Sequence, residues 1–132
     1  RQACTLSICG TKAYSTVITP KVLFALRYDY VNDILERRDR QWGESTESLR
    51  QQHFRFVKEF ANTGELIMGG AFDPPSDGAL IILKMKNRES AENFAKNDPY
   101  VKSGAVTKWD VKPWSVVINT KDLEGKLDHK NQ

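Results

Sequence analysis

Cysteine is scarce in this chain of 132 residues. Its two cysteines, Cys4 and Cys9, lie near the N-terminus with no histidine close by. A metal centre needs more ligands than this spacing offers, and a disulfide framework needs more cysteines. We therefore expect neither a metal site nor a disulfide framework, and no residue pattern in the chain indicates a cofactor.

Long apolar runs and a strong charge of one sign are missing as well. No apolar run approaches the ~20 residues of a membrane-spanning helix, so we expect no membrane span. The net charge is only +3, and basic residues are mixed with acidic ones, which does not favour nucleic acid as the main partner. RNA-recognition modules carry aromatic residues on their third strand, whereas the corresponding stretch here, ALIILKM at 79–85, has none.

Acidic residues are absent from the first part of the chain. None occurs before Asp29, and residues 1–16 are rich in serine and threonine. This composition is typical of the end of an organelle transit peptide, and the chain does not begin with methionine. We expect residues 1–20 to be a flexible segment, either a transit-peptide remnant or a simple tail. A mitochondrial protein is the expectation, with plastid or cytoplasm as alternatives.

The rest of the chain alternates between strand and helix patterns. Residues 21–118 are predicted to form one domain, and residues 119–132 a polar tail. Apolar residues recur at every second position in strands and at helical spacing in helices. Strands are expected at 22–30, 65–72, 79–85 and 105–111, with 115–118 as a further edge; helices are expected at 33–42, from Ser45 to a stop at Gly64, and at 88–97.

This order, βαββαβ, is typical of the ferredoxin-like fold. We expect an α+β domain whose antiparallel four-stranded sheet carries both helices on one face. The third strand is apolar on both sides, since Leu80 and Ile82 lie opposite Ile81. A sheet with one wet face would alternate more clearly. We therefore expect a homodimer in which the two sheets pack face to face.

His53 has the most unusual placement in the sequence. It lies between Leu49 and Phe56 in the apolar stripe of the second helical piece. The topology brings the ends of the first strand, at Asp29, and of the last helix, at Asp98, toward it. A carboxylate beside an imidazole selects its tautomer and raises its basicity, which suits acid–base catalysis. Asp98 or Asp29 is the expected partner; the alternative is a buried histidine satisfied by one hydrogen bond.

Three further residues are candidates for substrate binding. The amides of Gly69 and Gly70 could hold a bound oxygen, although such glycines also shape a strand through a bulge or a close approach. Arg50 lies one turn before Phe54, the neighbour of His53, and could hold an anion. A solvated surface arginine is the simpler interpretation.

Several short motifs follow one another over about residues 21–118: Tyr28-Asp29-Tyr30, Arg50-x-x-His53, Gly64-Glu65-Leu66 with Gly69-Gly70, Asp77-Gly78, Asp98-Pro99-Tyr100-Val101 with Gly104, and Lys112-Pro113-Trp114. Taken in order, these motifs resemble the YCII-related family of small dimeric α/β-barrel proteins. Phe54 and Gly70 stand where many members have leucine and proline. The resemblance implies that the hallmark histidine and aspartate of the family are His53 and Asp98, and we expect Asp29 and Tyr100 to take part in substrate binding.

Two functions follow from these features. The first is a metal-free small-molecule enzyme that uses His53 and Asp98 for acid–base chemistry of isomerase, lyase or hydrolase type on a small organic acid, lactone or ketone. The second is a non-catalytic accessory subunit of a large mitochondrial or plastid assembly, with the polar termini as docking arms. A haem role, known in the wider barrel superfamily, would depend on His53, because His129 lies in the tail.

Overall fold

The structure is a computed structural model that describes residues 21–120. The N-terminal segment 1–20 and the tail from residue 121, about which the sequence raised expectations, lie outside the described residues. In chain order the elements are β3 (Val22–Tyr30), α1 (Ile34–Arg37), α2 (Leu49–Thr63), β4 (Leu66–Ala71), β5 (Gly78–Met85), α3 (Arg88–Asn97), α4 (Pro99–Lys102) and β6 (Val106–Pro113).

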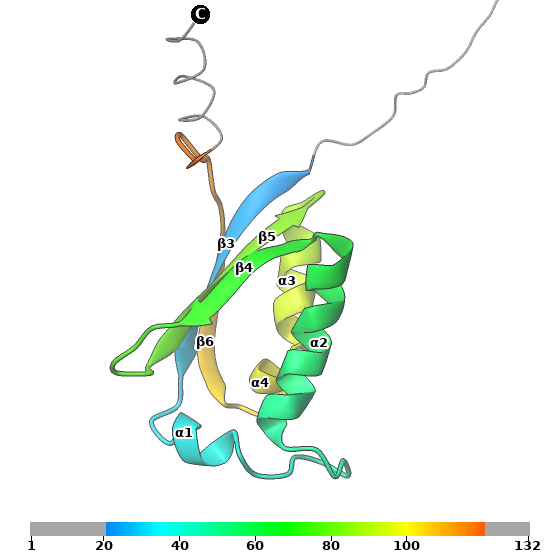
Figure 1. The fold of residues 1–132 in the computed structure, drawn as a ribbon, viewed down its shortest axis with the longest axis vertical. Helices are drawn as coiled ribbons and strands as arrows, with labels where there is room; N and C mark the ends of the chain where they lie inside the picture. Colours follow the sequence, from blue (N-terminus) through cyan, green and yellow to red (C-terminus); the bar gives the residue numbers. More distant parts are fainter. Residues whose placement is uncertain (1–20, 121–132) are drawn as a thin grey trace, which may run out of the picture.

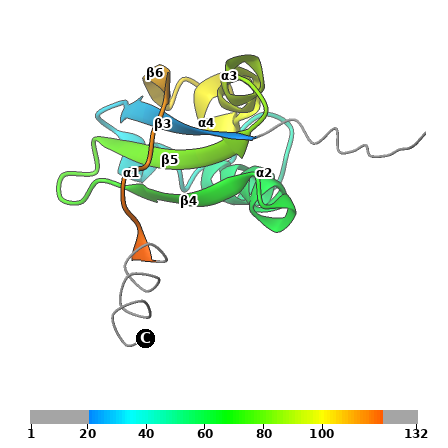
Figure 2. The ribbon, with the colours of Figure 1, turned by 90° about the horizontal axis from the view of Figure 1, so that it is seen from above.

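The strands form one sheet in the order β4-β5-β3-β6, and every neighbouring pair is antiparallel. Helices α2 and α3 both lie on one face of this sheet, as Figures 1 and 2 show. This arrangement confirms the α+β ferredoxin-like fold that the order of elements predicted. No helix within residues 21–120 is long and apolar enough to span a membrane.

The core lies between the sheet and helices α2 and α3. On β3, Leu26 and Tyr28 point toward the helices and are buried, as the alternating pattern predicts. Phe56 on α2 meets Phe94 on α3, with ring centroids 5.1 Å apart. Aromatic pairs at such spacing add about 0.5–1.5 kcal/mol to the free energy of burial. These contacts fix α2 against the sheet and so determine where His53 lies.

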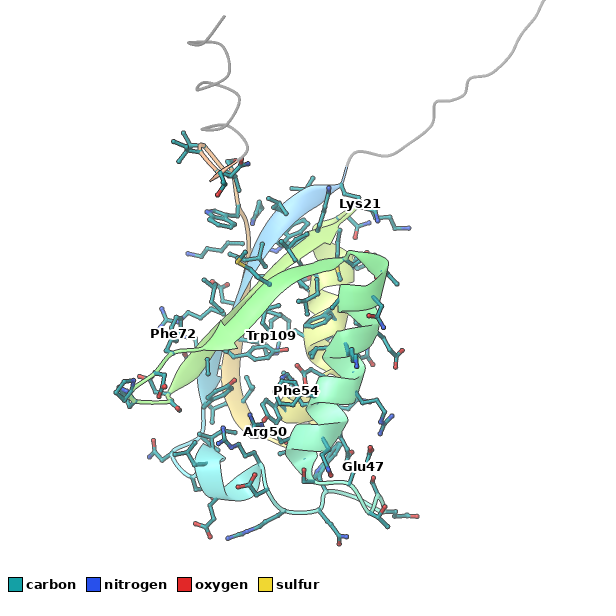
Figure 3. The ribbon with its side chains drawn as sticks, in the orientation of Figure 1. Lys21, Glu47, Arg50, Phe54, Phe72 and Trp109 are labelled. Carbon is teal, nitrogen blue, oxygen red and sulfur yellow. The ribbon has the colours of Figure 1, made fainter. Side chains whose placement is uncertain are left out.

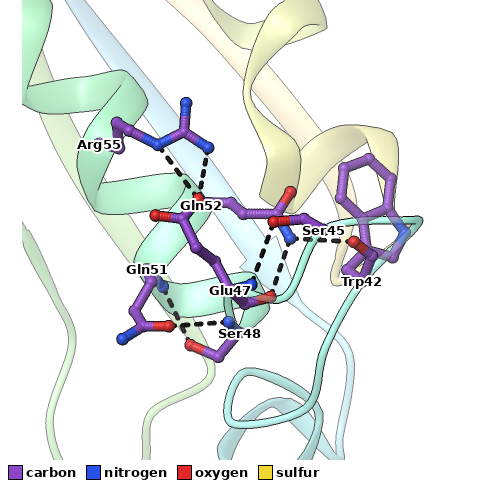
Figure 4. Close-up of polar contacts among 7 residues, drawn as sticks. All are labelled: Trp42, Ser45, Glu47, Ser48, Gln51, Gln52 and Arg55. Carbon is purple, nitrogen blue, oxygen red and sulfur yellow. Dashed lines mark hydrogen bonds and ion pairs between the residues drawn. The ribbon is translucent and has the colours of Figure 1, made fainter.

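Helix α2 begins after Ser48, three residues later than the predicted cap, Ser45. The Ser48 hydroxyl accepts a hydrogen bond from the Gln51 amide at 3.2 Å, and the Gln51 side chain accepts one from the Ser48 amide at 2.9 Å (Figure 4). This capping box satisfies two N–H groups that would otherwise lack partners. Gly64 ends the helix with a φ of 82°, as predicted. His53 therefore lies only about 7.5 Å along the axis from the cap.

Three segments differ from the sequence-based expectation. Helix α1 is a single turn, and Asp33 at its N-cap position makes no side-chain hydrogen bond to it. Helix α4 was not predicted; the Asp98 side chain caps it and Pro99 takes its first position, where proline is favoured. Strand β6 continues through Pro113, but residues 115–118 do not form the expected edge strand.

The other face of the sheet carries no helix in the described part of the chain (Figure 2). Apolar side chains gather there on β4 and β5. Met68 is 64% exposed, Leu80 is 39% exposed, and Ile82 is the register partner of Met68. Strand β5 therefore has two apolar faces, one buried in the core and one on the uncovered side of the sheet.

Gly78 opens β5 where this strand passes close to β3. A Cβ atom at Gly78 would lie 2.3 Å from the Tyr28 carbonyl oxygen, whereas nothing lies within 4 Å of a Cβ at Gly70. We expect Gly78→Ala to lower the free energy of unfolding by about 3 kcal/mol, because the backbone must move to relieve the clash. The control, Gly70→Ala, should change it by less than about 0.5 kcal/mol. Urea denaturation measures both; equal stabilities of the two variants would contradict the prediction.

Candidate active site

Asp98 lies at the corner between α3 and α4, and its side chain is fully buried. The helix ends here because Pro99 disfavours helical geometry at the residue before it. The carboxylate accepts three hydrogen bonds, from the Tyr28 hydroxyl at 2.8 Å, the Tyr100 amide at 2.9 Å and His53 Nδ1 at 2.7 Å. A buried carboxylate is stable only when such donors replace water. Strand β3, helix α2 and the α3–α4 corner thus meet at one carboxylate.

His53 is 9% exposed and is held from two sides. Its Nδ1 faces Asp98, and its ring stacks on the Tyr100 ring, with centroids 3.9 Å apart and planes 3° from parallel. Because both Asp98 oxygens accept hydrogen bonds from other donors, Nδ1 carries the proton that faces them. The opposite nitrogen, Nε2, is then the basic one. Within residues 21–120 no hydrogen bond involves Nε2.

His53 forms part of the wall of a cavity of about 330 Å³ between α2, α1 and β4. This volume suits a small ligand, since binding pockets typically measure about 300–1,000 Å³. Figure 3 shows Phe54 and Arg50 on the part of α2 that lies beside α1. No group of three or more His, Cys, Asp and Glu side chains that could hold a metal is found in the described residues. The residues that line the cavity include Tyr30, Arg38, Arg50, His53, Phe54 and Tyr100.

The tyrosines around the site remain neutral. Burial raises the pKa of the Tyr28 hydroxyl far above its usual value, and the charge of Asp98 raises it further. Tyr28 therefore keeps its proton and donates a hydrogen bond to Asp98 throughout the physiological pH range. Burial likewise raises the pKa of Tyr30 and of Tyr100. Both residues line the cavity, and both keep a neutral hydroxyl, which is able to donate a hydrogen bond.

The structure brings His53 and Asp98 into direct contact. Of the two alternatives for the glycine pair, the structure shows no bulge there, since the register shift in β4 lies between Leu66 and Met68. It shows a close approach at Gly69, where a Cβ atom would lie 3.3 Å from Ile81 Cγ1. Four other predicted site residues line the same cavity: Arg50, Gly69, Gly70 and Tyr100.

Asp29 does not reach His53, and the structure corrects this expectation. Its carboxylate lies 3.5 Å from the Arg27 Nε in an ion pair, and it does not line the cavity. Successive side chains of a strand point to opposite faces of the sheet. Since Tyr28 faces the core, Asp29 must face away from it. The alternation along β3 already contained this information.

Tyr28 and Arg38 belong to the site, although the sequence analysis identified neither. Tyr28 holds Asp98 from β3, and its inward-facing position at the end of that strand was the available signal. Arg38 lines the cavity from the segment after α1. No sequence pattern distinguishes Arg38 as a site residue, because Arg37 and Arg40 in the same stretch are chemically the same. Only the tertiary structure shows which of the three reaches the cavity.

The fold and the site together define a class of protein: a ferredoxin-like α+β domain with a buried histidine–aspartate pair that borders a small cavity. The sequence profile of the YCII-related domain matches residues 23–115, and the chain belongs to this family. This match confirms the resemblance seen in the motifs.

Three similar proteins place the family match in context. An uncharacterized protein of Haemophilus influenzae is 30% identical over 80 residues, covering 54% of this chain and 82% of that protein. The structure of 5-chloro-2-hydroxyhydroquinone dehydrochlorinase from Burkholderia phenoliruptrix AC1100, in complex with 2,5-dihydroxybenzoquinone, matches with a TM-score of 0.55 and 18% identity, over 70% of this chain and 93% of that one. A dimeric ferredoxin-like protein from an uncultured marine organism matches with a TM-score of 0.38 and 13% identity, over 76% and 94%. The dehydrochlorinase shares the fold of this protein.

Proposed function

We propose that this protein is a small-molecule enzyme in which His53 acts as the general base and acid. The observation that carries the proposal is the 2.7 Å contact between His53 Nδ1 and Asp98, made by a ring that also lines the cavity. Asp98 selects the tautomer with a free Nε2 and stabilises the imidazolium that forms when Nε2 takes a proton. Tyr28 and the Tyr100 amide hold the carboxylate in place, so the pair is preorganised.

Proton transfer from carbon is the reaction type that this arrangement supports best. In an elimination, Nε2 takes a proton from carbon, the C–H electron pair forms a double bond, and the leaving group departs with its bonding pair. In an isomerisation, His53 returns the proton to a different carbon. The fold neighbour is named as a dehydrochlorinase, and loss of hydrogen chloride is an elimination. This favours lyase or isomerase activity over hydrolysis.

A substrate screen tests the proposal. The probes are 5-chloro-2-hydroxyhydroquinone, followed by chloride release, unsaturated lactones, followed by absorbance, and aryl esters, followed by hydrolysis. We expect turnover by the wild type and by His129→Gln, which replaces the other histidine in the sequence. His53→Gln should lose that turnover. A probe converted equally well by the wild type and His53→Gln would refute the acid–base role.

We also propose that two copies associate through the uncovered face of the sheet. Met68 and Leu80 are exposed there, and Ile82 lies between Met68 on one side and Ala25 on the other in the register of the sheet. An apolar patch of this kind on a soluble domain marks an interaction surface. The cavity lies on the helix side of the sheet, so this association leaves the site accessible.

Leu80→Glu should convert the protein to a monomer, because it places a charge in the centre of the proposed interface. Sedimentation at micromolar concentration should give twice the chain mass of 15.1 kDa for the wild type. Leu35→Glu is the control, since Leu35 is an exposed leucine on the helix side of the sheet. A wild-type monomer at this concentration would rule out the proposed dimer.

A further inference from the structure

The cavity wall carries two positive charges and no negative one. Its charged residues are Arg38, from the segment after α1, and Arg50, on α2. No aspartate or glutamate of the described chain lines it. In a partly enclosed space with apolar walls, such charges produce a focused positive potential. The wall is therefore suited to an anionic ligand.

These two arginines differ from the others within residues 21–120. Every other arginine there forms an ion pair with a carboxylate, whereas neither Arg38 nor Arg50 has one within pairing distance. Arg38 Nε is buried and has no hydrogen-bond partner in the described structure. Arg50 lies over the Phe54 ring, 5.1 Å from its centroid. The terminal nitrogens of Arg38 also form no hydrogen bond within the described residues, and they are the donors that a ligand in the cavity can reach. The paired arginines are Arg27, Arg37, Arg40, Arg55 and Arg88.

The backbone holds the two arginines side by side. The Arg50 amide donates a hydrogen bond to the Arg38 carbonyl at 2.8 Å. Gln41 and Ser48 form an antiparallel bridge just beyond this contact. Two guanidinium groups at one cavity wall repel each other, and an anion between them removes that repulsion.

Aromatic rings complete the same wall. Tyr30 and Tyr100 meet edge to face, with centroids 6.0 Å apart, and Phe54 lines the cavity beside them. Burial raises the pKa of Tyr100, while the charges of Arg38 and Arg50, which line the same cavity, act in the opposite direction. The charges of Asp98 and Asp39 raise this pKa as well, but Asp39 forms an ion pair with neither arginine. Ring walls of this kind favour a flat, conjugated ligand.

We infer that Arg38 and Arg50 bind the oxyanion of a small planar substrate, a carboxylate or phenolate on a flat ring, and hold it beside His53 Nε2. This inference rests on the proposed function, because it names the substrate class of the same site. Arg38 is the main ligand, through its terminal nitrogens, since it has no carboxylate partner and, unlike Arg50, does not lie over an aromatic ring. Charge-assisted hydrogen bonds from a guanidinium to an oxyanion are short and directional, so they can orient the ring.

Paired probes test this inference by calorimetric or NMR titration. Benzoate and its neutral analogue benzamide report on a carboxylate, while 4-nitrophenolate at mildly alkaline pH and neutral 4-nitroanisole report on a phenolate. We expect at least one anion to bind about tenfold or more tightly than its neutral analogue. Arg38→Gln should weaken that binding by about 10- to 100-fold, and Arg38→Lys by less, because lysine keeps the charge but not the planar fork. Arg50→Gln should weaken it as well.

Matched controls are available on the same segment. Arg37→Gln and Arg40→Gln remove arginines that are paired with Asp33 and Glu36, and both should bind the anion like the wild type. Unchanged melting temperatures show that the variants are folded. Neutral analogues that bind as tightly as both anions, or an Arg38→Gln variant that binds like the wild type, would overturn the inference.

The two proposals can fail separately. His53→Gln should retain anion binding, because the arginines do not depend on the imidazole. Arginine-dependent anion binding without His53-dependent turnover would refute the acid–base function and leave the anion site standing. His53-dependent turnover without a preference for anions would refute the anion site and leave the function standing.

Discussion

Replacing Asp98 with alanine should lower the free energy of unfolding by about 3–5 kcal/mol, as expected when one partner of a buried polar network is removed. The substitution leaves the Tyr28 hydroxyl, the Tyr100 amide and His53 Nδ1 without their common acceptor. Each buried donor without a partner costs about 1–3 kcal/mol, although the losses are not additive. The N-cap of α4 is lost at the same time.

Urea denaturation of three variants separates these contributions. Asp98→Asn keeps the shape of the side chain and one carbonyl oxygen, so it should lower the free energy of unfolding by only about 1–2 kcal/mol. Asp29→Ala removes a carboxylate from a surface pair with Arg27, and surface pairs contribute about 0–1 kcal/mol. If Asp98→Ala were as stable as Asp29→Ala, the buried network could not be holding the α3–α4 corner in place.

His53→Gln should lower kcat by about 10²–10⁴-fold on any probe that the wild type converts, because general acid–base catalysis contributes a factor of this size. The loss should appear mainly in kcat, since the arginines still bind the anion. The free energy of unfolding should fall much less than in Asp98→Ala, because glutamine can still donate a hydrogen bond toward the carboxylate.

Asp98→Asn provides the second half of this test. The neutral amide can orient His53 but cannot stabilise its charged form as a carboxylate does, so kcat should fall by about 10²-fold or more while the fold is kept. His129→Gln should behave like the wild type. Steady-state kinetics on the same probe measure all three variants. An active Asp98→Asn variant would show that His53 works without a charged partner.

Sequence patterns predicted the elements better than their ends. Alternation along β3 separates the Tyr28 face from the Asp29 face, because that period follows directly from backbone geometry, and the structure shows that the Tyr28 face is the inner one. The start of α2 was misplaced because Ser45 and Ser48 are both good caps, and only the reciprocal Gln51 contact selects Ser48. Helix α4 was missed because four residues are too few to show a helical period.

The sequence by itself determined the order of the four strands and of the two helices that cover the sheet, the alternation along β3 and the place of one histidine in the apolar stripe of α2. These depend on periods of two and 3.6 residues, which neighbouring side chains reveal. The tertiary structure decided that the partner of His53 is Asp98, which lies 45 residues further along the chain. It also decided that Tyr28, 70 residues before Asp98, supports the same carboxylate. It also decided that Arg38 reaches the cavity and that Asp29 does not. Such contacts depend on how α2 and the α3–α4 corner dock on the sheet, which no local pattern records.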